Sequence, residues 1–149
     1  MPSIAKSRGF KNYLNKNVPS YYIQMTPLPY QTLAVSGLAL LALDAMYITA
    51  TKQLFAEQVA AVQRVAMTVR MPGVFMCYAL LIVGLYYFIL KEKRSIFDAF
   101  LLGIVIYGVF DSTNYALFKH WRPSILVMDT LWGGILFALA TYFTYALLY

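Results

Sequence analysis

Apolar residues fill four long stretches of this chain, and polar or charged residues gather between them. The four stretches cover residues 30–50, 73–90, 97–118 and 124–147. A helix needs about 20 consecutive apolar residues to cross a bilayer, so each stretch is long enough to be a membrane span. The pattern predicts an all-α protein, an integral membrane four-helix bundle, in which residues 30–149 form a single four-span membrane domain.

The segment between the first and second stretches, residues 51–70, has a different pattern. Phe55, Val59 and Val62 recur near one helical face, whereas Lys52 and Glu57 occupy polar positions. This arrangement predicts an amphipathic helix that lies in the membrane interface between spans one and two.

Composition agrees with the membrane class and excludes several kinds of site. Of the residues, 61% are hydrophobic and 12% charged, whereas a soluble domain has about 45–50% apolar and about 25% charged residues. The single Cys77 excludes a disulfide within the chain and a cysteine-cluster metal site. We expect it to be buried as a small apolar group. The single His120 excludes sites that need two histidines, and its position allows either a plain loop residue or a proton relay.

Residues 1–29 precede the first span and form a basic tail without acidic residues. We expect this tail to bind lipid headgroups or an acidic protein partner, and we expect no specific nucleic-acid partner. Four spans place both termini on one side, where seven Lys and Arg residues face five on the other, so both termini are predicted to be cytoplasmic. The bases of the tail are Lys6, Arg8, Lys11 and Lys16.

Three aspartates, Asp44, Asp111 and Asp129, lie inside the apolar stretches. An aspartate at the centre of a span costs about 2.5 to 3.5 kcal/mol on insertion scales, so such residues normally face a bundle interior. Each lies about five to seven residues from the same end of the bundle, which is roughly 7 to 11 Å at 1.5 Å per residue. We therefore expect the three carboxyl groups to converge in one pocket that opens towards that surface.

Helical spacing adds polar and aromatic neighbours to the aspartates. Like charges this close cannot all ionise cheaply, so a carboxyl group keeps its proton or a cation compensates. That cation could be a metal held by oxygen ligands, or a base reaching down from the rim. A structural role competes equally, because hydrogen-bonded aspartates can simply link helices. The supporting residues are Asn114, Thr113, Thr130, Trp132, Tyr47 and Tyr107, and the rim bases are Arg70, Lys119 and Arg122.

The aspartates lie in local motifs that resemble a known family. Asp111-Ser-Thr-Asn-Tyr-Ala is followed by Trp121 and then by Asp129-Thr-Leu-Trp-Gly, and the first span contains Leu-Asp44-Ala. These motifs are similar to those of the domain of unknown function 2177, small four-helix membrane proteins of bacteria, some algae and large DNA viruses. Phe110 stands where that pattern has Tyr, and Met128 where it has Val. The resemblance covers about residues 30–149 and implies the four-helix architecture, but it implies no reaction.

Two functional hypotheses follow. In the first, Asp44, Asp111, Asp129 and Asn114 bind a cation or a proton, and the protein could move a small solute as a homo-oligomer, because four helices barely enclose a pathway. In the second, the bundle is a structural membrane component of a larger assembly, such as a viral capsid with its inner membrane or an organellar complex, docked through the basic tail. An enzyme is the least supported class, because motifs for nucleophilic, metal-dependent or phosphate chemistry are absent. We expect no cofactor.

Overall fold

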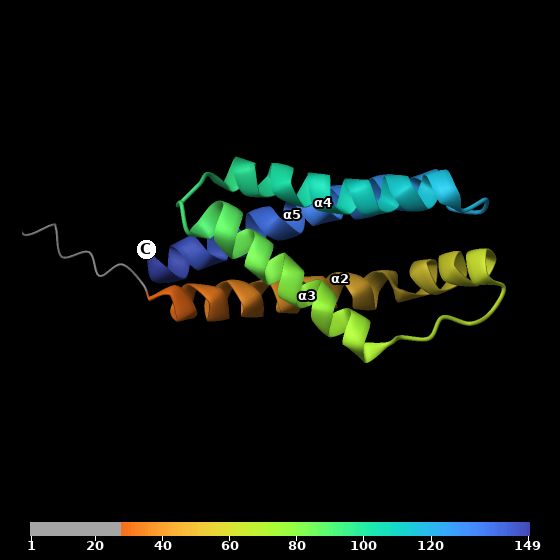
Figure 1. The fold of residues 1–149 in the computed structure, drawn as a ribbon, viewed down its shortest axis with the longest axis horizontal. Helices are drawn as coiled ribbons and strands as arrows, with labels where there is room; N and C mark the ends of the chain where they lie inside the picture. The colour runs from red at the N-terminus through yellow and green to blue at the C-terminus, as the bar shows by residue number, and fades with distance from the viewer. Residues whose placement is uncertain (1–27) are drawn as a thin grey trace, which may run out of the picture.

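The structure, a computed structural model, describes residues 28–149 and contains four long helices and no strand in that range (Figure 1). These are α2 (Pro29–Gln63), α3 (Met71–Leu85) with its π-helical continuation η2 (Tyr86–Leu90), α4 (Ile96–Leu117) and α5 (Pro123–Leu148). All four are long and apolar enough to cross a membrane. The prediction of an all-α, multi-pass membrane protein is confirmed. The four bases of the predicted tail lie outside the described residues.

The prediction of a separate interfacial helix over residues 51–70 is wrong. Residues 51–63 continue α2, which runs for 35 residues without interruption. Neither glycine nor proline occurs between Ala50 and Gln63, and this stretch is rich in Ala and Gln, which favour helix, so nothing stops the helical hydrogen-bond ladder. The helix ends at Arg64, which has a left-handed backbone with φ of 58°. Residues 66–70 are not helical and lead into α3.

The length of α2 exceeds what a bilayer requires. Thirty-five residues correspond to about 52 Å at 1.5 Å per residue, against about 30 Å for the hydrocarbon core. The C-terminal turns of α2 extend beyond the start of α3 and reach the level of the α4–α5 turn (Figure 1). The start of α2 and the end of α5 lie together at the opposite end (Figure 1). Which side of the membrane the termini face stays a prediction.

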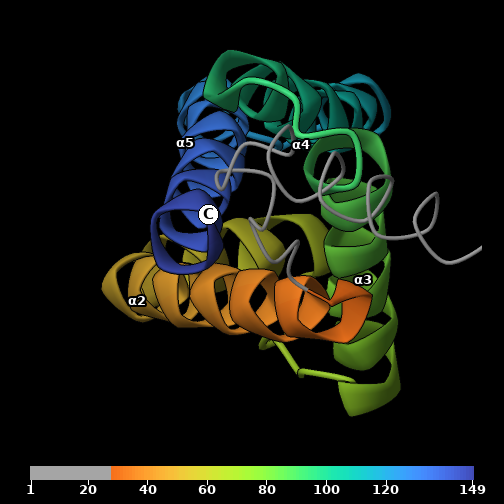
Figure 2. The same ribbon diagram turned by 90° about the vertical axis from the view of Figure 1, so that its left-hand side faces the viewer.

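The helices pack unequally. α4 and α5 form an antiparallel hairpin with the most extensive contact, and α2 packs along α5. α3 contacts α2, crosses it obliquely and barely approaches α4 (Figures 1 and 2). Viewed from the end, α3 lies across the bundle from α5 (Figure 2).

Glycines allow the close contact between α4 and α5. A Cβ atom on Gly103 would collide with the backbone carbonyl oxygen of Gly133. A Cβ atom on Gly134 would come within 2.7 Å of the Phe100 ring and 2.8 Å of Ile104. Small residues at these positions bring the two backbones together and so fix the positions of Asp111 and Asp129 on the facing helices.

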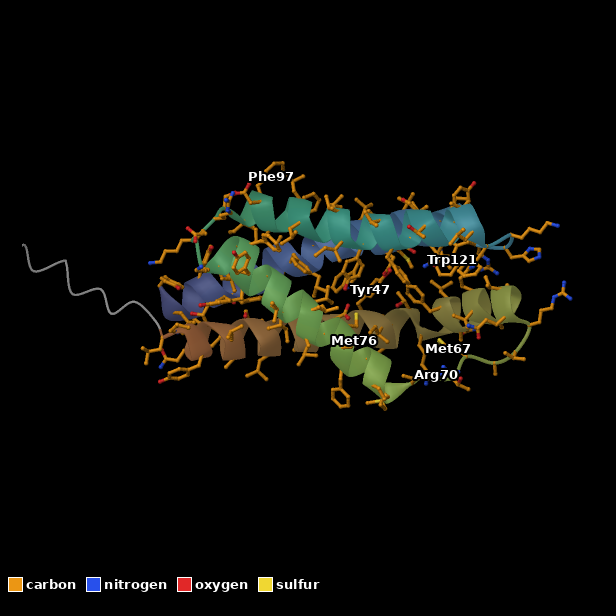
Figure 3. All side chains as sticks on the ribbon, in the orientation of Figure 1. Tyr47, Met67, Arg70, Met76, Phe97 and Trp121 are labelled. Atoms are coloured by element: carbon orange, nitrogen blue, oxygen red, sulfur yellow. The ribbon has the colours of Figure 1, made fainter. Side chains whose placement is uncertain are left out.

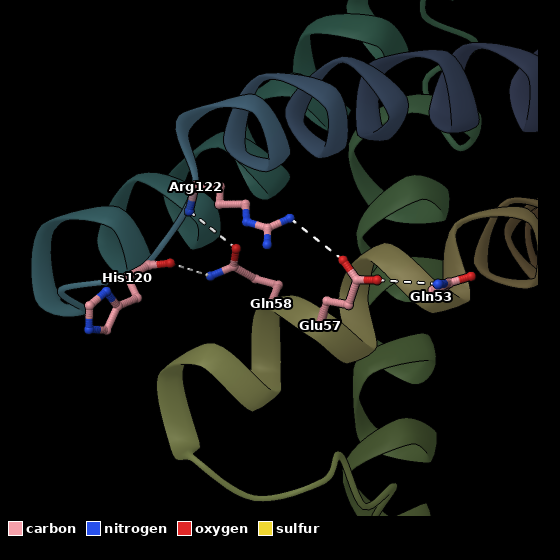
Figure 4. A network of polar contacts seen from close by, with 5 residues as sticks. All are labelled: Gln53, Glu57, Gln58, His120 and Arg122. Carbon is pink, nitrogen blue, oxygen red and sulfur yellow. Dashed lines mark hydrogen bonds and ion pairs between the residues drawn. The ribbon is translucent and has the colours of Figure 1, made fainter.

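A buried amide attaches the end of α2 to the α4–α5 turn (Figure 4). Gln58 is completely buried. Its Nε2 donates to the His120 carbonyl oxygen at 3.0 Å, and its Oε1 accepts from the backbone N–H of Arg122 at 3.2 Å. Beside it, Arg122 Nη1 lies 3.8 Å from Glu57 Oε2, and Gln53 donates to the other Glu57 oxygen. Since Arg122 and Glu57 are about half exposed, the fully paired Gln58 contributes more to this contact than their ion pair.

Candidate functional site

The Asp44 carboxylate links three helices. It lies on α2 and is 6% exposed. Tyr78 of α3 donates its hydroxyl to Oδ2 at 2.7 Å, and Trp132 of α5 donates Nε1–H to Oδ1 at 2.9 Å. Both oxygens therefore have a donor, so Asp44 is well satisfied by the protein alone.

Asp129 on α5 is joined to Asp44 through two aromatic side chains. The Tyr47 hydroxyl donates to Asp129 Oδ1 at 3.0 Å. The Tyr47 ring stacks on Trp132, with centroids 4.4 Å apart and ring planes 9° from parallel. Because Trp132 also holds Asp44, the stacked pair connects the two carboxylates. Figure 3 shows Tyr47 between the helices, in the middle of the bundle.

Asp111 on α4 has the fewest hydrogen-bond donors of the three aspartates. It is completely buried, and neither carboxylate oxygen has a hydrogen-bond partner among the described residues. Its carboxyl group lies within interacting range of the Asp129 carboxyl and of the Trp121 side chain. Trp121 Nε1 is also buried and lacks a hydrogen bond. The structure thus places a carboxylate without a good donor directly beside a second carboxylate.

The structure brings the three aspartates into one region, and Tyr47 lies within electrostatic interaction range of each of them. Tyr107 also lies there, near Asp44 and Asp129. The remaining predicted residues are less central. Thr113 is exposed and donates its hydroxyl to the Val109 carbonyl oxygen of its own helix, so it lies outside the site.

The two other supporting residues lie near the site without a hydrogen bond to it. Thr130 faces Gly108 across the α4–α5 contact, and its hydroxyl is buried without a hydrogen-bond partner in the described part of the chain. Asn114 is half-buried, and its side chain makes no hydrogen bond within residues 28–149.

Tyr78 is the donor that sequence reasoning missed. α3 begins on the side of the membrane where α2 ends, and Tyr78 lies seven residues into it. Counting depth at about 1.5 Å per residue would have placed its hydroxyl near the level of the aspartates. The neighbouring Cys77 was expected to be buried, but it is exposed on the outer surface of the bundle. That prediction was wrong because α3 diverges from α4 and leaves its side uncovered.

The rim bases do not neutralise the aspartates. Arg122 pairs with Glu57, and neither Arg70 nor Lys119 forms an ion pair within the described residues. The base nearest the site is instead Lys52, which lines a cleft shared with Asp44 and Asp129 but lies beyond ion-pair distance. Across residues 28–149, no three His, Cys, Asp or Glu side chains are close enough to hold a metal ion.

Two cavities lie next to the site and share two of their lining residues. The larger, about 430 Å³, lies between the C-terminal half of α2, the 64–70 linker and the start of α3. The smaller, about 220 Å³, lies between α3 and α4. Tyr107 and Asp129 line both. The walls are otherwise largely apolar: Ile48, Phe55, Val59, Met67, Val69 and Val74 in the larger cavity, and Leu81, Ile106 and Phe110 in the smaller.

Comparison with known proteins gives one match. The family model described as "Predicted membrane protein (DUF2177)" matches residues 30–146, which include all four helices and all three aspartates. No protein of curated function and no solved structure is significantly similar to the chain.

Proposed function

This chain belongs to the DUF2177 family of membrane proteins, and from its acidic site we propose that it binds a proton between Asp111 and Asp129 inside the membrane. Asp44 accepts from Trp132 and thereby positions the Tyr47 donor, and Asn114 lies about one helical turn after Asp111 on α4. Proton binding is the form of the broader cation-binding hypothesis that the geometry supports best.

The observation that carries this proposal is the buried carboxylate of Asp111, which has no hydrogen-bond partner within residues 28–149. An ionised carboxylate without a donor in an apolar interior costs several kcal/mol. Asp129 lies beside it and would add like-charge repulsion. A single shared proton removes one charge and supplies the missing donor, as it does for other carboxyl pairs.

A metal ion is less well supported than a proton. A hard cation such as Ca²⁺ takes six to eight oxygen ligands, and the described residues do not gather three acidic side chains around one point. In addition, the Asp44 oxygens are already occupied by Tyr78 and Trp132. A proton needs only the two carboxyl groups that are in contact.

The surroundings of the two aspartates favour proton binding over passage of a solute through the bundle. The larger cavity gives Asp129 access from the end of the bundle that carries the α4–α5 turn. Towards the other end the bundle is filled by a buried apolar cluster, in which Leu40, Leu85 and Phe137 are fully buried. Movement of a solute would therefore require a rearrangement or an oligomer, which remains the further step of the original hypothesis.

A scaffold role in a larger assembly remains the alternative proposal. It depends on a basic tail that is outside the described residues, so the aspartate geometry neither supports nor weakens it. Loss of assembly on deletion of residues 1–27, with the behaviour of the acidic site unchanged, would favour this role.

The test is the melting temperature of the detergent-purified protein across pH 5 to 9. The folded protein holds a proton that the unfolded chain has released, so stability falls as pH rises, by up to about 1.4 kcal/mol per pH unit for one proton. Asp111→Asn provides a permanent N–H donor and should remove this slope, with a melting temperature at pH 9 equal to or above that of the wild type.

Glu92→Gln is the matched control, because it makes the same carboxylate-to-amide change at an exposed position. It should keep the wild-type slope. A wild-type protein whose melting temperature does not respond to pH, with Asp111→Asn merely less stable, would show that the aspartates serve as structural links.

A further inference from the structure

The smaller cavity opens sideways between two spans. α3 diverges from α4, and the gap between them is lined by Cys77, Leu81, Ile106 and Phe110 before it reaches Tyr107 and Asp129. Cys77 is exposed at its edge, and Phe110 is 59% exposed. Since both residues lie within spans, their exposed surfaces face the hydrocarbon of the bilayer. The gap is therefore an opening towards lipid.

This lateral opening leads to a carboxylate oxygen of Asp129 that can accept a hydrogen bond from a ligand. Asp129 is 8% exposed and lines both cavities. Tyr47 donates to its Oδ1. Oδ2 has two lone pairs, so it can take part in the proton shared with Asp111 and still accept one hydrogen bond from a ligand. A buried carboxylate oxygen that lacks a full set of donors favours a ligand that brings its own positive charge and hydrogens.

The walls define the rest of the ligand. Apart from Asp44, Asp129, Lys52 and two tyrosines, the larger cavity is apolar, and its volume of about 430 Å³ is within the usual range of small-molecule sites, about 300–1,000 Å³. Within it, two carboxylates face a single lysine, so a cation is favoured over an anion. An apolar entrance from lipid and an anionic interior together suit a molecule with a hydrocarbon chain and a cationic head.

We propose that the smaller, lateral cavity binds a long-chain primary ammonium ion from the bilayer, with the ammonium at Asp129, which lines both cavities, and the alkyl chain between α3 and α4. The proposal rests on the acidic site of the proposed function and names a class of ligand for it. The ammonium donates to the open Asp129 oxygen, and the chain replaces lipid contacts along Leu81 and Ile106.

The test uses the full chain in lipid nanodiscs at fixed pH, with dodecylammonium as the probe. Two readouts are the melting temperature and the rate at which a lipid-soluble reagent labels Cys77, the single cysteine of the chain. At ten times its dissociation constant the probe fills about nine-tenths of the sites, so labelling should slow about tenfold while the melting temperature rises. A cysteine placed at the exposed Leu101 in a Cys77→Ala background should be labelled at an unchanged rate.

Three variants make the outcome specific. Asp129→Asn should abolish the protection, and it keeps an oxygen that can accept from Tyr47. Lys52→Gln should strengthen the protection, because it removes the competing positive charge from the cavity wall. Ile106→Phe should weaken it by filling the lateral cavity without changing any charge.

Equal protection by dodecanol would overturn the proposal, since the carboxylate would then play no part. Protection that survives Asp129→Asn would overturn it as well. The pH slope of the melting temperature is measured without any amine, so it tests the proton site even if dodecylammonium does not protect Cys77. A normal slope without amine protection therefore rejects this inference and keeps the proton site, whereas loss of the slope rejects the proton site itself.

Discussion

At the residue scale, the site depends on which aspartate the protein itself satisfies. Asp44 receives two donors, Asp129 receives one from Tyr47, and Asp111 receives none within the described residues. This gradient assigns different roles to three residues of the same type. Asp44 orients the aromatic side chains, whereas the two less satisfied carboxyl groups remain available for a proton or a ligand.

Removing one donor from Asp44 tests its structural role. Tyr78→Phe deletes a 2.7 Å hydrogen bond and leaves a buried carboxylate oxygen without its partner. We expect a loss of about 1.5 to 3 kcal/mol if the bond is to a charged group, measured by unfolding in mixed detergent micelles. Tyr142→Phe is the control, because Tyr142 is exposed on α5 and makes no side-chain hydrogen bond within residues 28–149. Equal stability of the two variants would contradict the assigned role of Asp44.

The convergence of the aspartates could be predicted from sequence, but their partners could be predicted only in part. Distance from the span ends is a one-dimensional quantity, and it predicted a shared level for Asp44, Asp111 and Asp129. The structure places all three within interaction range of Tyr47. Direction around each helix depends on how the helices rotate against one another, which no spacing rule determines. For this reason Thr113 was placed in the site although it faces outward, and Tyr78 was missed.

At the scale of the elements, the α4–α5 hairpin is the rigid part of the molecule. Gly103→Ala places a methyl group against the Gly133 backbone, which cannot move without separating the helices. We expect a cost of about 1 to 3 kcal/mol from overpacking, together with a weaker pH response, because Asp111 and Asp129 would be shifted relative to each other.

Gly84→Ala makes the same substitution in α3, where nothing lies within 4 Å of the new methyl group. It should stabilise the protein by about 0.5 to 1 kcal/mol, since alanine loses less backbone entropy in a helix. We therefore expect the two substitutions to change the free energy of unfolding in opposite directions, as measured by thermal unfolding. A destabilising Gly84→Ala or a neutral Gly103→Ala would contradict this description of the packing.

The end of α2 shows why a change in polarity is a poor marker of a helix end. The hydrophobic pattern changes near residue 51, where the chain leaves the apolar layer, but backbone hydrogen bonding continues to Gln63. Helices commonly stop at glycine, proline or a suitable cap, and the sequence offers neither glycine nor proline between residue 51 and Arg64. Polarity along α2 therefore reports the environment of the helix rather than its boundary.

At the scale of the whole molecule, Gln58 joins the end of α2 to the α4–α5 turn across 62 residues of sequence. Gln58→Leu removes two hydrogen bonds and leaves the His120 carbonyl and the Arg122 N–H without partners. A loss of about 1 to 2 kcal/mol should open the turn about 5- to 30-fold more often, seen as faster tryptic cleavage after Lys119. Gln63→Leu, at an exposed position at the end of the same helix, should leave the cleavage rate unchanged.

Sequence patterns predicted the number of spans and their chain order but not the divergence of α3 from α4. The sequence of α3 is apolar on all sides, as expected for a helix that faces lipid over much of its circumference. Such a helix has no single apolar face, so its sequence does not show which helix it packs against. The lateral cavity, and with it the route to Asp129, follows from an oblique crossing that only the three-dimensional structure shows.

The attachment through Gln58 also has a consequence for how the protein is made. A membrane protein is synthesised from the N-terminus, so α2 and its buried amide exist before residues 118–122 have been translated. Until the final hairpin inserts, Gln58 has no partner in the turn, and Asp44 lacks its Trp132 donor. Insertion of α5 satisfies both residues in one step. The hairpin of α4 and α5, the last of the four described helices to be translated, thus completes both the acidic site and the closure of the bundle end.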